Sequence, residues 1–361
     1  MKFGTSALAL CAFLAACGDG TPFNGETEAD TGTGTDGSTG EDGGATLSRE
    51  GLPPGTASPT PDDGIRRSEP EDDNGNGEAK DFAYNSEDDT FTIDGLAFDG
   101  DNVYTRGDPV SSLGPYAVYE GAEVVADSQT GQPINQFTHS AIYGVSKNVD
   151  ASGTPKTQFA IVRTGQYQNY GFGGFIYKRE NGVTLETANG AQGIYSGSTA
   201  GIRDFQGAGG MQYTTGTLTV QVDFGDFNDQ GGVVGDGVSG SLTNRRIYDV
   251  NGRDVTSDVV ANINTENDSS LTSLPAALFE VGPGVLDANG EIIGSINSSF
   301  VNNEGDKVAY ESGNYYAVMA GDDSQEIVGV LVLENAAEAQ GVTARDTSGF
   351  IIYREPTPVT P

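Results

Sequence analysis

The sequence predicts an all-β protein whose second half closes into a small antiparallel barrel. The strongest observation is a strict alternation of apolar and polar residues within Gly216–Asn244. One face of this segment carries Leu218, Val220, Val222 and Phe224, and the other carries Thr217, Thr219, Gln221 and Asp223. A period of two is typical of a strand with one buried and one wet face. Glycine is abundant, with 53 residues, and glycine within strands suits a tightly curved barrel wall.

Further strands are predicted on both sides of this segment in the chain. The cluster Asp226–Gly232 predicts a turn, after which Val233–Leu242 returns as a second strand. Glu291–Val301 alternates again. Asn314–Gly321 and Glu326–Glu334 predict another hairpin, with its turn at residues 322–324.

The first half is also β-rich. Its predicted strands are Phe91–Phe98, Tyr116–Glu120, Phe137–Val145, Thr157–Thr164 and Gly171–Arg179. The end of this half, Gly173–Glu180 (GGFIYKRE), is similar to the end of the second, Ser348–Glu355 (SGFIIYRE), so we expect a domain boundary near residue 182. Helical periodicity is scarce, and only Asn335–Gln340 (NAAEAQ) predicts a short helical turn.

The N-terminus has the pattern of a bacterial lipoprotein signal peptide. Lys2 is followed by an apolar stretch, Phe3–Phe13, which is too short for a permanent membrane helix. The stretch ends in Leu14-Ala15-Ala16-Cys17, which resembles a lipobox. We therefore predict cleavage after residue 16, acylation of Cys17 with palmitate among the chains, and anchoring in a membrane. An ordinary secretory signal followed by an idle cysteine is the alternative. Since Gly18, not an acid, follows Cys17, we expect the outer membrane.

Residues 17–80 predict a disordered, acidic tether. Repeats of Thr, Gly, Asp and Glu leave almost nothing to bury, so ordering them would cost more entropy than burial returns. The whole chain carries a formal charge of −34, which disfavours nucleic-acid binding. The sequence holds two cysteines; Cys11 leaves with the signal and Cys17 takes the lipid. No thiol remains for a disulfide or a catalytic nucleophile.

The residues that could carry chemistry are few. His139 is the single histidine; it is either a haem or metal ligand or a strand residue with a solvent-exposed imidazole, and the lack of partners favours the second. Asp249–Asp254 and Asp287–Glu291 superficially resemble calcium loops, but Asn-Gly between apolar runs favours hairpin turns. The sequence singles out no catalytic residue, metal ligand, cofactor or ligand-binding residue.

The second half resembles the β-barrel domain of bacterial surface lipoproteins related to transferrin-binding protein B. The matching residues, taken in order, are Tyr195-Ser196-Gly197 with Gly201, Val220–Gly225, Val238–Leu242, Gly313–Tyr316 and Glu326–Val330. The resemblance implies an antiparallel eight-stranded barrel over residues 183–357, beside a smaller β-rich handle domain over residues 81–182. It implies one handle–barrel lobe rather than two, and no transferrin-contacting segment is recognisable.

The leading hypothesis is a lipid-anchored, surface-exposed outer-membrane protein without enzymatic activity. It would capture a protein, haem or a small solute, for example in iron acquisition. The alternatives are a structural envelope protein without a specific ligand and, from a third class, an exported hydrolase that uses acidic residues. An exposed apolar patch would favour binding over a structural role.

Overall fold

The computed structural model describes ten stretches of the chain. They are residues 51–70, 79–94, 103–127, 129–167, 170, 172–186, 191–224, 237–280, 285–339 and 342–356. All of these stretches belong to one compact structural unit, residues 36–361. The predicted signal peptide, Cys17, most of the predicted tether and the turn Asp226–Gly232 lie outside the described residues. No described helix is long and apolar enough to cross a membrane.

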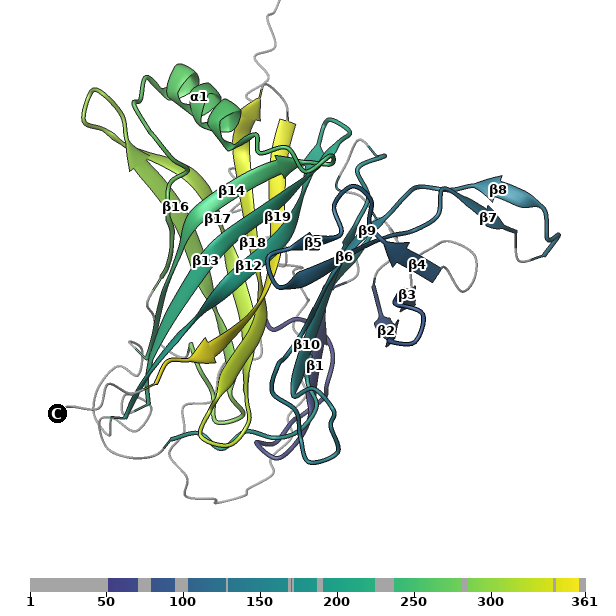
Figure 1. Cartoon of the computed structure of the whole chain (residues 1–361). Coiled ribbons are helices and arrows are strands. Elements are labelled where there is room, and N and C mark those ends of the chain that lie inside the picture. Colours follow the sequence, from purple (N-terminus) through teal and green to yellow (C-terminus); the bar gives the residue numbers. More distant parts are fainter. Residues whose placement is uncertain are drawn as a thin grey trace, which may run out of the picture. The chain divides into compact units, whose positions relative to one another are not determined.

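Eight antiparallel strands close into a barrel, as predicted (Figure 1). They are β12 (Gln192–Gln206), β13 (Met211–Asp223), β14 (Val238–Asp249), β15 (Ala277–Phe279), β16 (Glu291–Val301), β17 (Lys307–Ala320), β18 (Glu326–Ala339) and β19 (Val342–Arg354). Each strand pairs with the next, and β19 pairs with β12 to close the wall, with Ala200 opposite Gly349. The predicted hairpin of Asn314–Gly321 and Glu326–Glu334 forms the paired part of β17 and β18.

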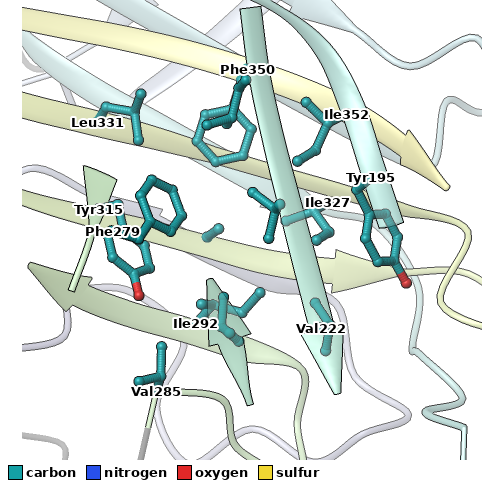
Figure 2. Close-up of a cluster of buried hydrophobic side chains, with 14 of the residues drawn as sticks. Tyr195, Val222, Phe279, Val285, Ile292, Tyr315, Ile327, Leu331, Phe350 and Ile352 are labelled. Atoms are coloured by element: carbon teal, nitrogen blue, oxygen red, sulfur yellow. The ribbon is translucent and has the colours of Figure 1, made fainter. Parts of the chain in front are cut away.

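The barrel interior is packed with apolar side chains (Figure 2). Leu218, Val220, Val222 and Phe224 all belong to this core and are at most 2% exposed. Gln221 on the opposite face is exposed. The predicted parity of the segment is therefore confirmed. Glycine makes room for rings in this core: a Cβ at Gly240 would come within 2.7 Å of Phe279, whose ring stacks on Tyr315 with centroids 3.8 Å apart.

The first half forms the predicted handle, a nine-stranded antiparallel sheet. Its strands are β1 (Ile65–Ser68), β2 (Asp81–Asn85), β3 (Thr90–Asp94), β4 (Val103–Arg106), β5 (Ser112–Leu113), β6 (Tyr116–Glu120), β9 (Ser140–Val145), β10 (Thr157–Arg163) and β11 (Gly174–Arg179). The order across the sheet is β1-β11-β10-β9-β6-β4-β3-β2, with β5 beside β6. Two further strands, β7 (Val124–Ala126) and β8 (Pro133–Asn135), form a separate two-stranded sheet.

Both faces of the handle sheet are buried at its strands β9, β10 and β11. One face carries its own core, which includes Phe82, Phe91 and Tyr143. The other face packs on the barrel, where Phe175 of β11 stacks on Tyr316 of β17 with ring centroids 6.0 Å apart. Burial on both faces explains why β9, β10 and β11 are almost continuously apolar rather than alternating.

Residues 51–69, which we call the strap, differ from the sequence prediction. We predicted that they belong to the disordered tether, but Ile65–Ser68 is strand β1 and pairs with β11. The tether prediction is therefore wrong for these residues. Their short polar sequence contains two arginines, and one of them, Arg67, finds a buried partner in Glu291, which a local pattern cannot show.

Helical structure also differs from the prediction. The helical turn expected at Asn335–Gln340 is wrong, because β18 continues to Ala339, which pairs with Val342 of β19. The one described helix, α1 (Thr256–Asn267), was not predicted. It buries Val259, Val260 and Ile263 in a core that also contains Phe300 and Tyr310 of the barrel wall.

Candidate functional site

The structure places only some of the candidate residues taken from the sequence. Cys17 lies outside the described residues. His139 is buried, contrary to the expected exposed imidazole, and its Nδ1 lies 3.1 Å from the carbonyl oxygen of Phe137. Burial lowers the pKa of His139 to about 4, so the imidazole is neutral at pH 7. Within the described stretches, no three His, Cys, Asp or Glu side chains gather as a metal-binding group.

The two calcium-like loops are tight turns, as predicted, although the first leads from β14 into helix α1 rather than into a second strand. Asp249 Oδ1 accepts hydrogen bonds from the backbone N–H groups of Asn251 and Arg253, both at 2.9 Å. Asp287 Oδ1 accepts equivalent bonds from Asn289 and Glu291, also at 2.9 Å. These carboxylates therefore hold the turns in shape.

Within the described residues, the barrel interior is occupied by side chains. Its core is filled by the apolar cluster of Figure 2. Two cavities next to α1 and β14 have volumes of about 30 and 10 Å³, which is room for about one water molecule. Near α1, Arg245 Nη2 donates to Glu311 Oε1 at 3.0 Å, and Asp346 lies 4.0 Å from the same guanidinium. The charges in this end of the barrel thus pair with one another.

A larger cavity of about 500 Å³ lies where the strap, the handle and the barrel meet. Its lining includes Asp62, Asp150, Lys156, Asn181 and Asp322. Hydrogen bonds from Ser152, Thr154 and Asn181 lower the pKa of Asp150 to about 2. The Lys156 ammonium donates to Gln325 Oε1 at 2.9 Å. This polar lining suits a small hydrophilic solute better than the large apolar face of haem.

The hairpin of β7 and β8 exposes apolar side chains without a core beneath them. Val125 lies opposite Ile134 on one face, and Ala126 lies opposite Pro133 on the other. Val124 is 53% exposed and Ile134 is 38% exposed. The hairpin is drawn apart from the barrel, at the end of the handle (Figure 1). A two-stranded hairpin is marginally stable by itself, so local features must preserve this one.

The turn and the base of the hairpin supply that support. At the turn, Asp127 Oδ1 accepts hydrogen bonds from the backbone N–H and the hydroxyl of Thr130, both at 2.6 Å. At the base, three partly buried rings gather: Phe172 lies 6.0 Å from Phe137 and 5.5 Å from Tyr167 between centroids. The hairpin is therefore a preformed surface attached to a small aromatic cluster.

Sequence reasoning did not find this hairpin. The segment 127–132 predicts a polar turn, but each strand is only three residues long, too short to show a period. The available signal was the pair of short apolar runs, Val124-Val125 and Pro133-Ile134, on either side of that turn.

Comparisons with known proteins give similarities at the level of fold. No family model matches the sequence. No curated protein matches it either. Among solved structures, a double mutant of transferrin binding protein B (TbpB) from Haemophilus parasuis Hp5 aligns with 10% identity and a TM-score of 0.35, covering 74% of this chain and 41% of that chain. A surface lipoprotein aligns with 11% identity and a TM-score of 0.29, covering 59% of this chain and 81% of the other.

HpuA from Kingella denitrificans, in a complex with human haemoglobin, aligns with 10% identity and a TM-score of 0.26, covering 79% of this chain and 97% of that chain. The present chain spans 41% and 50% of the lengths of two Haemophilus parasuis TbpB structures. Alignments at these TM-scores establish no ligand. The closed eight-stranded barrel and the handle-like sheet that the sequence resemblance implied are both present, so that resemblance is confirmed as one of fold.

Proposed function

We propose that this protein is a lipid-anchored, cell-surface binding protein that captures a protein partner through hairpin β7–β8. The observation that carries the proposal is the exposed apolar surface on both faces of this hairpin, where Ile134 on one face is 38% exposed and Val124 on the other is 53% exposed. Exposed β-branched side chains in a preformed hairpin contribute little to folding. They are typical of a surface that is buried when a partner binds.

The shape of the hairpin favours a protein over a small ligand. Small-molecule sites are concave and enclose most of the ligand surface, whereas β7–β8 is an exposed two-stranded ribbon. Its strands pair only with each other within the described part of the chain. A partner that contacts the ribbon from both sides can therefore bury Ile134 on one face and Val124 on the other, and can also hydrogen-bond to a strand edge, which small solutes or haem cannot do over this length.

Charge indicates the chemistry of the partner. The stretch 121–139 contains Glu123 and Asp127 but no lysine or arginine, and the whole chain carries −34. A second copy of this chain would be repelled. The proposal is therefore a partner whose contact surface is apolar with a basic rim, and rising salt should slow its association.

The proposed anchor and domain order rest on the sequence. Leu14-Ala15-Ala16-Cys17 supports signal cleavage after residue 16 and acylation of Cys17 in the outer membrane. The tether then runs from Cys17 to the strap at residue 51, followed by the handle to residue 182 and the barrel over 183–357. A lipid anchor followed by a tether, a handle and a barrel suits a protein that holds a partner at the cell surface without catalysing a reaction.

The test compares hairpin variants with matched barrel variants. We would replace Val124 and Ile134 together with Asp, and in the control replace Leu278 and Val301, which are 57% and 61% exposed on the barrel. Each protein, residues 18–361, would be used to capture partners from culture medium and host fluids, and binding of the captured partner would then be measured by calorimetry.

We expect the wild type and the barrel variant to bind equally. The hairpin variant should bind at least about tenfold more weakly, since the loss of two apolar contacts at about 1 kcal/mol each exceeds the roughly 1.4 kcal/mol that corresponds to a factor of ten. Equal binding by both variants would show that the hairpin is not the capture surface. Failure to recover any partner from varied fluids would instead favour the structural envelope role.

A further inference from the structure

The strap is folded between the handle and the barrel. Residues 54–56, in the first part of the strap, lie beside β1. The Thr56 N–H donates to the Arg66 carbonyl, and the Ser68 N–H donates to the Pro54 carbonyl, both at 3.0 Å. β1 pairs in turn with β11, with Arg67 opposite Tyr177. The strap therefore supplies an edge strand to the handle sheet.

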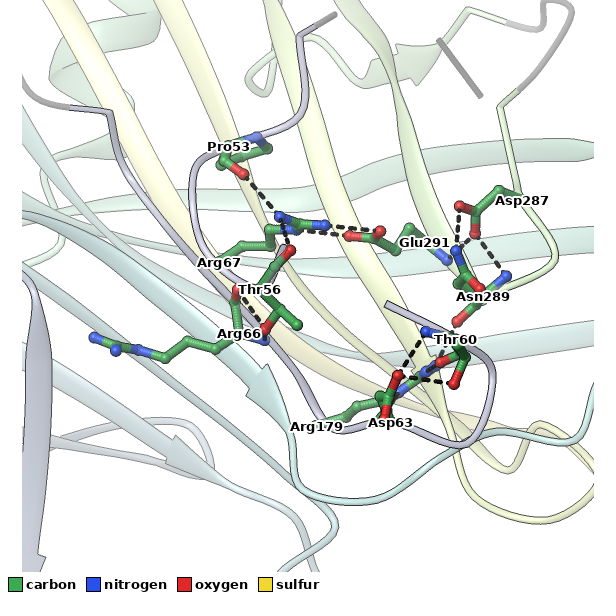
Figure 3. A network of polar contacts seen from close by, with 10 residues as sticks. All are labelled: Pro53, Thr56, Thr60, Asp63, Arg66, Arg67, Arg179, Asp287, Asn289 and Glu291. Carbon is green, nitrogen blue, oxygen red and sulfur yellow. Dashed lines mark hydrogen bonds and ion pairs between the residues drawn. The ribbon is translucent and has the colours of Figure 1, made fainter. Parts of the chain in front are cut away.

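Arg67 joins the strap to the barrel (Figure 3). Its Nε and Nη2 donate to the two carboxylate oxygens of Glu291, at 2.7 and 2.8 Å. Both side chains are buried, with 5% and 1% exposed. Glu291 is the first residue of barrel strand β16. A bidentate pair in a dry environment has strict geometry, and the loss of one partner leaves an uncompensated buried charge.

Arg179 of handle strand β11 donates hydrogen bonds to backbone carbonyl groups of both the barrel and the strap (Figure 3). Its Nη1 donates to the carbonyl oxygens of Asn289 and Met319 in the barrel half, at 2.6 and 2.9 Å. Its Nε donates to the Asp63 carbonyl in the strap at 3.1 Å. Burial lowers the pKa of Arg179 to about 10, so it is still charged at pH 7.

Glu69 makes a third junction at the end of the strap. Its carboxylate lies 2.6 Å from Arg163 of handle strand β10 and 3.7 Å from Arg345 of barrel strand β19. Arg345 also pairs with Asp204 of β12 at 2.8 Å. A single strap carboxylate thus lies between a handle arginine and a barrel arginine.

We propose that the strap is a coupling element, which holds the handle against the barrel so that the three parts unfold as one cooperative unit. Three charged side chains make the junctions. Arg67 joins the strap to the barrel, and Arg179 and Glu69 each connect the strap, the handle and the barrel. The strap also directly follows the part of the predicted tether that precedes residue 51, so a load on a partner held at the handle reaches the proposed anchor through the strap. The coupling does not depend on the identity of any ligand, and its tests need no ligand.

The first test cuts the chain without removing any strap residue. A protease site is introduced within residues 71–78, between the strap and β2 along the sequence, in the protein of residues 18–361. After cleavage we expect the N-terminal fragment to co-elute with the remainder in native buffer and to separate in denaturant. Calorimetry of the cleaved complex should show one transition. Separation in native buffer, or an unchanged melt once the fragment is removed, would overturn the proposal.

The second test uses a double-mutant cycle. Arg67→Met and Glu291→Met should each lower the melting temperature by about 10 °C and split the single transition into two. The double variant should recover most of the loss, because an apolar pair can replace a buried ion pair at little cost. The control is Arg246→Met, which breaks a surface pair whose side chains are 59% and 38% exposed and should shift the midpoint by no more than about 2 °C.

Single variants that melt as the control does would contradict the coupling role. If Arg67→Met does not fold, the cleavage test on the otherwise unchanged chain still decides the matter.

Discussion

The most specific prediction about the barrel concerns which side chains of strand β13 point into its core. Val222 is 1% exposed in the apolar core, opposite Val238 on β14 and Gly193 on β12. Val222→Asp places a carboxyl group there without a partner. To stay protonated at pH 7 against an ordinary pKa near 3.9 costs about 4 kcal/mol, and the lost burial of valine adds about 2 kcal/mol. We expect a melting temperature lower by about 12–24 °C for a domain of this size.

The pH dependence of the unfolding free energy of Val222→Asp distinguishes the cost of the carboxyl charge from the cost of lost packing. The buried carboxyl has a folded-state pKa above its unfolded value, so its extra cost is present at neutral pH. That cost disappears as the pH falls toward about 4, where the unfolded chain is protonated as well. Val222→Asn, which is polar but uncharged, should lack this component. Urea unfolding followed by circular dichroism at pH 7, 5.5 and 4, each relative to the wild type, measures the difference between the two variants.

The neighbouring residue provides the matched control. Gln221 lies on the exposed face of the same strand, so Gln221→Asp should change the free energy of unfolding by no more than about 0.5 kcal/mol. Similar small losses from Val222→Asp and Gln221→Asp would refute the one-face-buried strand. A large loss from Gln221→Asp alone would mean that the register is shifted by one residue.

Two further predictions concern the anchor and the buried histidine. Cys17→Ser should release the protein from the membrane fraction and abolish labelling by a palmitate analogue; a wild-type protein that takes no label would contradict lipid anchoring. His139 has a folded pKa of about 4, below its unfolded value near 6.5, so the unfolded state binds the proton first and stability is lost as the pH falls from 6.5 to 4. That loss amounts to about 3 kcal/mol, and His139→Gln should lack it. Denaturant titrations at pH 7 and 4 compare the two proteins, and an identical pH dependence would exclude a buried neutral imidazole.

The local sequence pattern was sufficient to predict side-chain orientation where one face of a strand is buried. The alternation of Leu218 to Phe224 predicted which side chains point inward, and the alternation within Glu291–Val301 agrees with the buried positions of Ile292, Ile296 and Phe300 on β16. Both sets are buried in the structure. Such patterns can be read without the fold because each residue's environment repeats with the period of the backbone.

Local propensity failed for the helix and for the end of β18. Helix α1 has few strong helix formers and no side-chain hydrogen bond at its N-cap, and its stability comes from packing Val259, Val260 and Ile263 on the barrel wall. Asn335–Gln340 contains helix formers, yet the described part extends the strand because β19 pairs with it on both sides of a register shift, at Asn335 and at Ala339. In both places, tertiary contacts override the intrinsic preference.

The sequence by itself determined the N-terminal lipobox, the lack of a disulfide framework and of histidine or cysteine ligand sets, and the inward face of the barrel strands. Only the tertiary structure decided the strap and the hairpin that we propose as a capture surface. The two strands of β7–β8 are too short to carry a period, and Arg67 and Glu291 are 224 residues apart in the chain. No local pattern can pair charges over that distance, because the contact exists only after the handle sheet and the closed barrel have fixed the position of both strands.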